Sequence, residues 1–253
     1  MSNAGGPSSV RVLAAGAPPP EISVVVPLYN ERDNVSPLAC ELIPVLETLG
    51  RSFEVVFVND GSTDGSEEPL RALRQADRRV RILTLERNSG QTAALSAGFA
   101  AARGETVLTL DADLQNDARD IPRLLGMLEG CDAVVGWRGS RRDSWLRRIS
   151  SRIANAVRNA LSDDDIIDTG CSLKAYRREA LARIKLYTGM HRFIPTLLRM
   201  EGYVVRQVEV GHRPRHAGES KYNIRNRILR SFVDLLAVRW MKRRMLRYNA
   251  KEE

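Results

Sequence analysis

From residue 21 onward, short apolar runs rich in β-branched residues alternate with longer segments of helical periodicity, and few folds accommodate this alternation. Strands are predicted at residues 22–27, 54–59, 81–85, 106–110 and 133–135. Helices long enough to connect one parallel strand to the next are predicted between them, at 34–49, 67–75, 91–103 and 120–128. The pattern therefore predicts an α/β fold, with a Rossmann-like sheet flanked by helices.

Polar residues follow four of these five strands at once. They are Tyr29-Asn30-Glu31, Asp60-Gly61-Ser62, Asn88-Ser89-Gly90 and Asp111-Ala112-Asp113. Ligands of open α/β sheets bind outside the carboxyl ends of the strands. We therefore expect these four clusters to converge on one edge of the sheet.

The segment after the fourth strand carries oxygen ligands at alternate positions. Asp111, Asp113 and Gln115 can point the same way, because residues two apart on an extended backbone share a face. Such oxygens suit Mg²⁺ or Mn²⁺, which keeps some of its waters and completes its shell with substrate phosphates. Acidic residues after a strand also cap helices, so the motif alone leaves both interpretations open.

Residues 59–66, Asn-Asp-Gly-Ser-Thr-Asp-Gly-Ser, have the composition of a tight turn. Asp64 or Ser66 is expected to cap the helix that follows. Asp60, at the end of the strand, can offer its carboxylate to the imide N–H of a nucleobase. The two interpretations are compatible, because a rigid turn would hold that carboxylate in place.

Five strings along the chain together resemble the inverting glycosyltransferases of family 2, which have the GT-A fold, a Rossmann-like nucleotide-binding mixed sheet flanked by helices. They are SVVVPLYNERDNV (23–35), VVFVNDGSTDGS (55–66), RNSGQTAALSAGFAAARGETVLTLDADLQND (87–117), DTGCSLKAYRREAL (168–181) and RPRHAGESKY (213–222). Within that family they are similar to the branch that transfers a sugar to a polyprenyl phosphate. The resemblance covers about residues 21–240 in collinear order.

The resemblance implies a role for each matching residue. The nucleotide of the donor would be held by Pro27, Tyr29, Glu31, Val58, Asp60, Asp111 and Ala112. The ligands of Mg²⁺ or Mn²⁺ would be Asp111, Asp113 and Gln115. The catalytic groups would be Asp113, Arg138, Arg215 and Lys221, and the acceptor phosphate would be bound by Arg147, Arg148 and Ser151.

The loop after Arg138 departs from the pattern of the mannosyl enzymes. It carries Arg141, Arg142 and Asp143 where those enzymes have a glycine-rich stretch, which favours a UDP-sugar over GDP-mannose as donor. Without the resemblance, these arginines would equally fit a solvated surface.

A phosphate acceptor is ionised at neutral pH and needs no strong general base, so we expect Asp168 to act only as a positioning residue. The alternative is a family 2 enzyme that acts on a saccharide or another non-lipid acceptor.

The formal charge of +8 is concentrated at one end of the chain. Residues 1–220 hold 29 basic and 28 acidic side chains, whereas residues 221–247 hold nine basic and one acidic. A basic surplus is compatible with nucleic acid, a membrane surface or an anionic substrate. Its confinement to one C-terminal element favours an anionic membrane surface and argues against nucleic acid.

A last helix is predicted at 224–247, with apolar residues on one face that turns basic toward its end. The apolar residues are Leu229, Phe232, Val233, Leu236 and Trp240, and the basic ones are Arg243, Arg244 and Arg247. An amphipathic helix of this kind suits a membrane interface. The alternatives are that the apolar face packs on the catalytic domain, on a second copy in a homo-oligomer, or on a membrane partner protein.

These patterns divide the chain into a disordered leader (1–20), a GT-A domain (21–222) and a basic helix with its tail (223–253). No uncharged apolar run approaches the length of about 18 residues that a membrane span needs. Three distant cysteines give neither a disulfide framework nor a zinc site. We therefore expect a cytoplasmic protein, peripheral on the cytosolic membrane face, that is monotopic, relies on a membrane partner, or is a truncated form of a longer relative.

Smaller features complete the expectations. A further helix is expected at 145–161 and a further strand at 203–210. The histidines, His191, His212 and His216, lack metal-ligand spacing and are expected to form hydrogen bonds or lie on the surface. Gly98 is expected to permit close packing of its helix.

Overall fold

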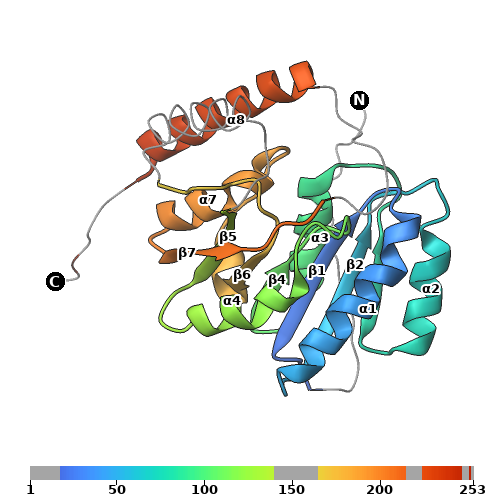
Figure 1. Ribbon diagram of the computed structural model, residues 1–253. Helices are drawn as coiled ribbons and strands as arrows, with labels where there is room; N and C mark the ends of the chain where they lie inside the picture. Colours follow the sequence, from blue (N-terminus) through green and yellow to red (C-terminus); the bar gives the residue numbers. More distant parts are fainter. Residues whose placement is uncertain (1–17, 140–164, 215–223, 247–250, 252–253) are drawn as a thin grey trace.

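The computed structural model describes residues 18–139, 165–214, 224–246 and Lys251 (Figure 1). Within α8, side chains are described from Phe232 onward. The strands are β1 (Ile22–Leu28), β2 (Phe53–Asn59), β3 (Val80–Thr84), β4 (Thr106–Thr109), β5 (Ala133–Arg138), β6 (Lys174–Arg177) and β7 (Val205–Val210). The helices are α1 (Arg32–Thr48), α2 (Glu67–Ala76), α3 (Gln91–Ala101), α4 (Ile121–Met127), α6 (Arg178–Leu181), α7 (Ile194–Met200) and α8 (Ile224–Arg244), with 3-10 turns η1 (Ala118–Asp120) and η2 (Met190–Phe193).

The described strands form one seven-stranded sheet in the order β3-β2-β1-β4-β6-β5-β7. Strand β6 runs antiparallel to both of its neighbours, β4 and β5, whereas the remaining pairs are parallel. The expected mixed α/β sheet flanked by helices is thus confirmed. Every predicted strand and helix that falls within the described residues is present, with ends that differ from the prediction by at most three residues.

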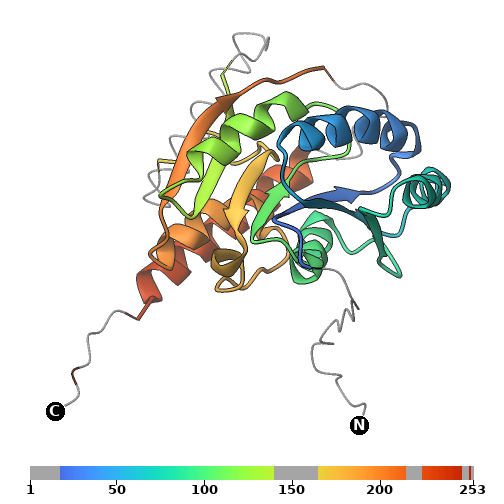
Figure 2. The same cartoon turned by 90° about the horizontal axis from the view of Figure 1, so that it is seen from below.

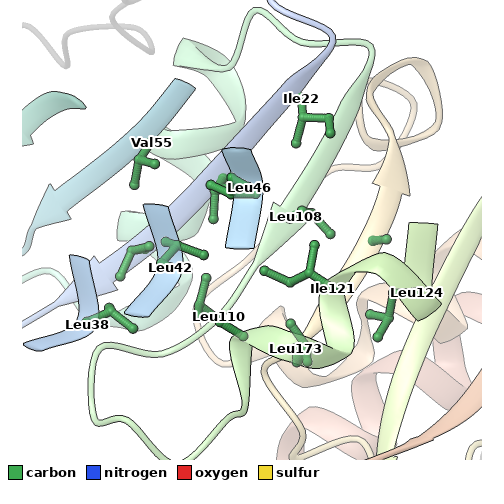
Figure 3. Packing of buried hydrophobic residues seen from close by; sticks show 14 of the residues in the cluster. Ile22, Leu38, Leu42, Leu46, Val55, Leu108, Leu110, Ile121, Leu124 and Leu173 are labelled. Atoms are coloured by element: carbon green, nitrogen blue, oxygen red, sulfur yellow. The ribbon is translucent and has the colours of Figure 1, made fainter. Parts of the chain in front are cut away.

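Helices cover both faces of the sheet, as the view from below shows (Figure 2). One apolar layer joins the sheet to α1, α2 and α4, and in Figure 3 Leu42, Leu46 and Ile121 pack over the central strands. The second layer joins the sheet to α3, α6 and α7. Strand β1 contributes to both, because its side chains alternate between the faces: Val24 and Val26 lie in the first layer and Val25 in the second.

Gly98 permits the close approach of α3 to the sheet, as predicted. A Cβ atom at this position would overlap Cγ1 of Val25 and would lie 3.2 Å from Cγ2 of Val58. Helix α3 therefore lies closer to β1 and β2 than any larger residue at position 98 would allow. This packing brings its first turn to the edge where the strands end.

Strand β6 was not anticipated from the sequence. Its four residues, Lys174–Arg177, begin and end with a cation, so the segment lacks the apolar run by which the other strands were recognised. Its pairing is decided by tertiary contacts, since it fills the space between β4 and β5. Strand β7 begins at Val205 and not at Tyr203, because Gly202, with φ of 88°, turns the chain just before it.

Helix α8 packs on the body through a different face from the one expected. Leu235 and Val238 are buried against Met190, Phe193 and Leu197 of η2 and α7. The predicted apolar face stays exposed: Phe232 is 47%, Val233 57%, Leu236 43% and Trp240 63% accessible. The expectation that this face could pack on the catalytic domain is therefore wrong for its described residues. None of the described helices has both the length and the apolar character that a membrane crossing requires.

Candidate active site

The strand order creates a switch point beside β1. From β1 the chain continues outward through β2 and β3 on one side, and β4 joins it on the other. The carboxyl ends of strands at such a point form the usual ligand site of an open α/β sheet. Tyr29, Asn30 and Glu31 follow β1 directly, and Asp111, Ala112 and Asp113 follow β4. The sheet thus places these two predicted clusters on either side of the switch point.

The segment after β4 alternates in burial as predicted. Asp111, Asp113 and Gln115 are half-buried, whereas Ala112 and Leu114 belong to the core. Leu114 adopts a left-handed φ of 61°, a costly conformation for a leucine that bends the chain directly after Asp113. Asp113 accepts a bond from the backbone N–H of Gln115 at 3.2 Å, and the side chain that caps η1 is that of Asp117. The strained bend keeps Asp111 and Asp113 at the edge of the sheet.

Asp111 is fixed from two other parts of the chain. Its carboxylate accepts a hydrogen bond of 2.8 Å from Nε2 of Gln91, in the first turn of α3. Its backbone N–H donates to the hydroxyl oxygen of Ser172 at 3.2 Å, and that oxygen also accepts from the amide of Asn116 at 2.6 Å. Desolvation, followed by the charge of Asp113, raises the pKa of Asp111 to about 6.

The chemistry of this donor set fits a hard divalent cation. A cation beside Asp111 and Asp113 would favour the ionised form of Asp111, which burial and the charge of Asp113 otherwise disfavour. In the part of the chain that the structure describes, no three His, Cys, Asp or Glu side chains gather into a metal site. Two carboxylates and an amide suit an ion that takes its remaining ligands from water and phosphate, as Mg²⁺ and Mn²⁺ do.

Asp60 holds the start of α3. Its carboxylate is almost fully buried and accepts the backbone N–H groups of Ser89 at 2.7 Å and Gly90 at 2.8 Å. Gly90 precedes α3 with a φ of 91°. Asp60 therefore positions the turn before Gln91, and its predicted contact with a nucleobase stays a prediction.

The loops after β1 and β2 are joined by hydrogen bonds. Asn30 donates its backbone N–H to Ser62 at 2.9 Å and accepts from the N–H of Thr63 at 2.7 Å. The N–H of Glu31 donates to Ser66 at 3.0 Å. These bonds fix the backbone of Asn30 and Glu31, and thereby the segment that carries the half-buried Tyr29 and Glu31 near the switch point.

The predicted turn over residues 59–66 is present, with one difference in its capping. Asp64 accepts from the N–H and the hydroxyl of Ser66 at 3.0 and 2.5 Å, and from the N–H of Arg32 at 3.1 Å. Ser66 precedes α2, but no side-chain bond caps that helix, because the hydroxyl of Ser66 is engaged by Asp64 and Glu31. The expected cap of α2 by Ser66 is therefore wrong, whereas Asp64 forms the expected turn with the N–H of Ser66 and ties it to α1.

Arg138, the last residue of β5, forms a bidentate ion pair with Asp168. Its Nε and a terminal nitrogen donate to the two carboxylate oxygens at 2.6 and 2.9 Å. Asp168 also accepts the backbone N–H of Gly170 at 3.0 Å. Burial acts to lower the pKa of Arg138, but the hydrogen bonds and charge of Asp168 outweigh it and raise the pKa above its ordinary value. The geometry makes Asp168 a positioning group for the guanidinium.

The chain after β7 is tied to the loop that follows Asp113. Arg213 pairs with Glu41 of α1 and with Asp117, each at 2.7 Å, and its N–H donates to the carbonyl of Gln115 at 2.9 Å. These contacts bring the start of the RPRHAGESKY string to the loop that directly follows the Asp111–Asp113 segment.

Several predicted groups lie outside the described residues. They are Arg141, Arg142, Asp143, Arg147, Arg148, Ser151, Arg215, His216 and Lys221, together with residues 1–17 and the helix expected at 145–161. Pro27 and Val58 are described and pair in the β1–β2 register, where both are buried. The side chain of His191 forms the kind of bond expected of it, since its Nδ1 lies 2.8 Å from the hydroxyl of Thr92.

Three described residues at this edge were not predicted. Gln91 and Ser172 hold Asp111, and Lys174 is buried at the start of β6. The sequence offered a signal for Gln91, which directly follows the polar cluster at 88–90. Ser172 and Lys174 approach the site through the unforeseen antiparallel strand, so the order of the sequence alone did not point to them.

Solved structures share the fold. The chain aligns with a glucosyl-3-phosphoglycerate synthase from Mycobacterium tuberculosis in complex with Mn²⁺, UDP-glucose and phosphoglyceric acid, at a TM-score of 0.69 and 21% identity over 87% of this chain and 80% of that one. It also aligns with a mannosyltransferase from Pyrobaculum calidifontis in complex with GDP-Man and Mn²⁺, at a TM-score of 0.64 and 23% identity over 87% and 64% of the two chains. The GT-A architecture is thereby confirmed.

Curated relatives are more similar in sequence. A dodecaprenyl-phosphate galacturonate synthase from Rhizobium johnstonii is 38% identical over 91% of this chain and 69% of its own length. An undecaprenyl-phosphate 4-deoxy-4-formamido-L-arabinose transferase from Edwardsiella ictaluri is 40% identical over 80% of this chain and 63% of its own. The chain thus spans about two thirds of the length of these relatives. The model of the family described as Glycosyl transferase family 2 matches residues 23–185, and the chain belongs to that family.

Proposed function

We propose that this protein transfers one sugar from a nucleotide-sugar to a polyprenyl phosphate, with inversion at the sugar carbon. The names of the relatives from Rhizobium johnstonii and Edwardsiella ictaluri support a polyprenyl phosphate as the acceptor. A UDP-sugar is the favoured donor, on the ground of the loop that follows Arg138.

One observation carries the proposal. At the switch point of the sheet, the carboxylate of Asp111, beside that of Asp113, lies within electrostatic reach of the Asp168-bound guanidinium of Arg138. Carboxylates that can hold a cation, next to a fixed guanidinium, match a reaction in which a diphosphate leaves and a phosphate attacks. Such a transition state gathers negative charge, so fixed positive charge is the largest aid to catalysis.

Within this proposal, Asp111, Asp113 and the amide of Gln115 hold Mg²⁺ or Mn²⁺. The bound ion would stabilise negative charge on the departing diphosphate. Mn²⁺ in the solved structures of the Mycobacterium tuberculosis and Pyrobaculum calidifontis enzymes supports this assignment. Gln91 and Ser172 keep Asp111 in place, so the carboxylate need not reorganise when the donor binds.

Further roles follow from the resemblance. Tyr29, Glu31 and Asp60 would form the nucleotide site around the joined loops. Arg147, Arg148 and Ser151 would receive the acceptor phosphate, with Arg215 and Lys221 near the diphosphate. A phosphate acceptor is already ionised at neutral pH, so Asp168 serves by holding Arg138 and not as a general base.

The exposed apolar face of α8 would place this site at the membrane surface. Phe232, Val233, Leu236 and Trp240 are open to solvent, and Arg243 and Arg244 follow them as exposed cations. Apolar residues followed by cations suit the boundary between lipid tails and anionic headgroups. The opposite face of α8 packs on α7, so the helix would link the lipid surface to the catalytic body.

A thermal-shift panel tests the donor assignment. UDP, GDP and their sugar conjugates would each be added with and without Mn²⁺, at about a hundred times the expected Kd, where one ligand adds about 2.7 kcal/mol to the free energy of unfolding. We expect uridine diphosphates to raise the Tm only with Mn²⁺ present. A panel in which no nucleoside diphosphate raises the Tm would contradict the proposal.

A further inference from the structure

Lys174 is a buried lysine at the ligand edge of the sheet. It is the first residue of β6 and is only 5% exposed. In the sheet it lies opposite Thr109, the last residue of β4, and opposite Val135 of β5. Asp111 follows Thr109 by two residues. Lys174 therefore lies level with the end of β4, next to the candidate site.

The side chain of Lys174 lies on the α3 and α7 side of the sheet. Directly opposed residues of an antiparallel pair share a face, and Val135 belongs to the apolar layer that includes α3 and α7. Tyr176, two residues further along β6, lies in the same layer. Gln91 of α3 also reaches Asp111 from this side.

The charged neighbours of Lys174 already have partners of their own. Asp168 is paired with Arg138, and Asp111 accepts from Gln91. Lys174 itself forms no hydrogen bond or ion pair with any residue that the structure describes. Desolvation lowers its pKa, against the opposing influence of Cys171, Asp168 and Asp111, while Arg192 adds to the lowering.

Lys174 is only 5% exposed, so its ammonium loses most of its hydration, and no hydrogen bond to a described residue compensates for this loss; such a group lowers the stability of a fold. A methionine of similar length would fill the same space in an apolar layer without this cost. The position is therefore better explained by a ligand than by packing. The ligand must be an anion that enters at the carboxyl ends of β4 and β5.

We propose that Lys174 binds a phosphate group of one of the two substrates and is a substrate-binding residue beside the Asp111–Asp113 pair. This inference rests on the proposed function, because that function brings phosphates to this edge of the sheet. The diphosphate of the donor and the phosphate of the polyprenyl acceptor offer the same chemistry to an ammonium, and the experiment below separates them.

The test compares Lys174→Met with Lys185→Met. The first variant removes the buried charge with little change in volume, and the second removes the charge of an exposed lysine outside the candidate site. Lys174→Arg restores a cation, and Lys174→Gln is a second neutral variant in case the methionine disturbs the fold. The Kd for UDP and for uridine, the KM for undecaprenyl phosphate and the Tm would be measured for each protein.

If Lys174 binds the donor, Lys174→Met should weaken UDP about tenfold to a hundredfold and leave uridine unchanged. If it binds the acceptor, UDP affinity stays as in the wild type and the KM for undecaprenyl phosphate rises by a similar factor. In both cases the Tm should hold or rise, and Lys174→Arg should recover part of the loss. A purely structural lysine would give the reverse, a lower Tm with unchanged Kd and KM.

Two outcomes would overturn the inference. In the first, Lys174→Met and Lys174→Gln match Lys185→Met in every binding constant. In the second, the wild-type protein binds no nucleotide and transfers no sugar, which contradicts the proposed function and this inference together. The behaviour of the wild-type protein distinguishes the two.

Discussion

The buried carboxylate of Asp111, which would bind the cation, lowers the stability of the metal-free fold when it is ionised. Its pKa of about 6 lies above the value of about 3.9 that it has in an unfolded chain. The folded state therefore binds the proton more tightly than the unfolded state does. The stability that this contributes is fully present below pH 4 and is lost as the pH rises through 6.

The substitution Asp111→Asn should reveal this loss. We expect the metal-free variant to melt at a higher temperature than the wild type at pH 7.5, because the buried negative charge is gone while Gln91 keeps a partner. The gain should vanish near pH 4, where the wild-type carboxyl is already protonated. Melting curves between pH 4 and 8 check this, and an equal Tm for the two proteins at pH 7.5 would refute it.

Asp168 gives a second residue-level prediction. If it only positions Arg138, Asp168→Asn keeps an oxygen acceptor for the guanidinium and should slow sugar transfer to polyprenyl phosphate by about tenfold or less. The pH profile of kcat should keep its shape. Removal of a general base costs about 10² to 10⁴ in rate, so a loss of that size with a changed pH profile would indicate a base and favour a saccharide acceptor.

The residues around Asp111 also show what a local pattern can predict. The shared face of Asp111, Asp113 and Gln115 was predicted from their spacing of two, and their alternating burial agrees with it, while their role as metal ligands stays a prediction. Gln91, Ser172 and Lys174 reach the same place from α3 and β6, and no local pattern encodes a contact across the sheet. Motifs report the chemistry of a segment, whereas its supporting contacts depend on tertiary structure.

At the level of elements, strands were predicted correctly where the segment is an apolar run that is buried on both faces of the sheet, as in β1 and β2. Strand β6 failed this criterion because Lys174 and Arg177 interrupt its apolar character. The position of helix α8 in the chain was predicted correctly. The distribution of apolar residues around the helix did not indicate which of these residues pack on the body of the protein. Leu235 and Val238 do so because α7 offers an apolar surface there, which is a property of another element.

The two faces of α8 predict different effects of mutation. Replacing Phe232 and Trp240 by serine should weaken binding to vesicles of anionic lipid by at least about tenfold, since each loses most of its apolar area, while the Tm stays within about 2 °C. Leu235→Ser and Val238→Ser, the matched control on the packed face, should lower the Tm instead. Cosedimentation and melting curves measure both, and vesicle binding that is indifferent to Phe232 and Trp240 would count against a membrane role.

At the scale of the whole molecule, the basic residues that give the net charge of +8 are concentrated in one part of the chain. Residues 1–220 are nearly balanced, and the surplus lies in residues 221–247, which include all of α8. A catalytic body with paired charges and a basic helix packed beside it suits an enzyme whose donor is dissolved and whose acceptor is in a lipid layer. The family of the chain and the polyprenyl-phosphate transferases among its relatives agree with this division.

The most direct test of this account is the reaction itself. Purified protein, anionic vesicles containing undecaprenyl phosphate, and UDP-sugars would be incubated with Mn²⁺ or with EDTA, and the glycolipid would be measured for the wild type, Asp113→Ala and a control, Glu201→Ala, at an exposed carboxylate after α7. We predict transfer by the wild type and the control only with Mn²⁺, and at least about a hundredfold less by Asp113→Ala. Near-normal transfer by Asp113→Ala in EDTA would contradict the metal site, and the absence of glycolipid from every wild-type reaction would contradict the proposed function.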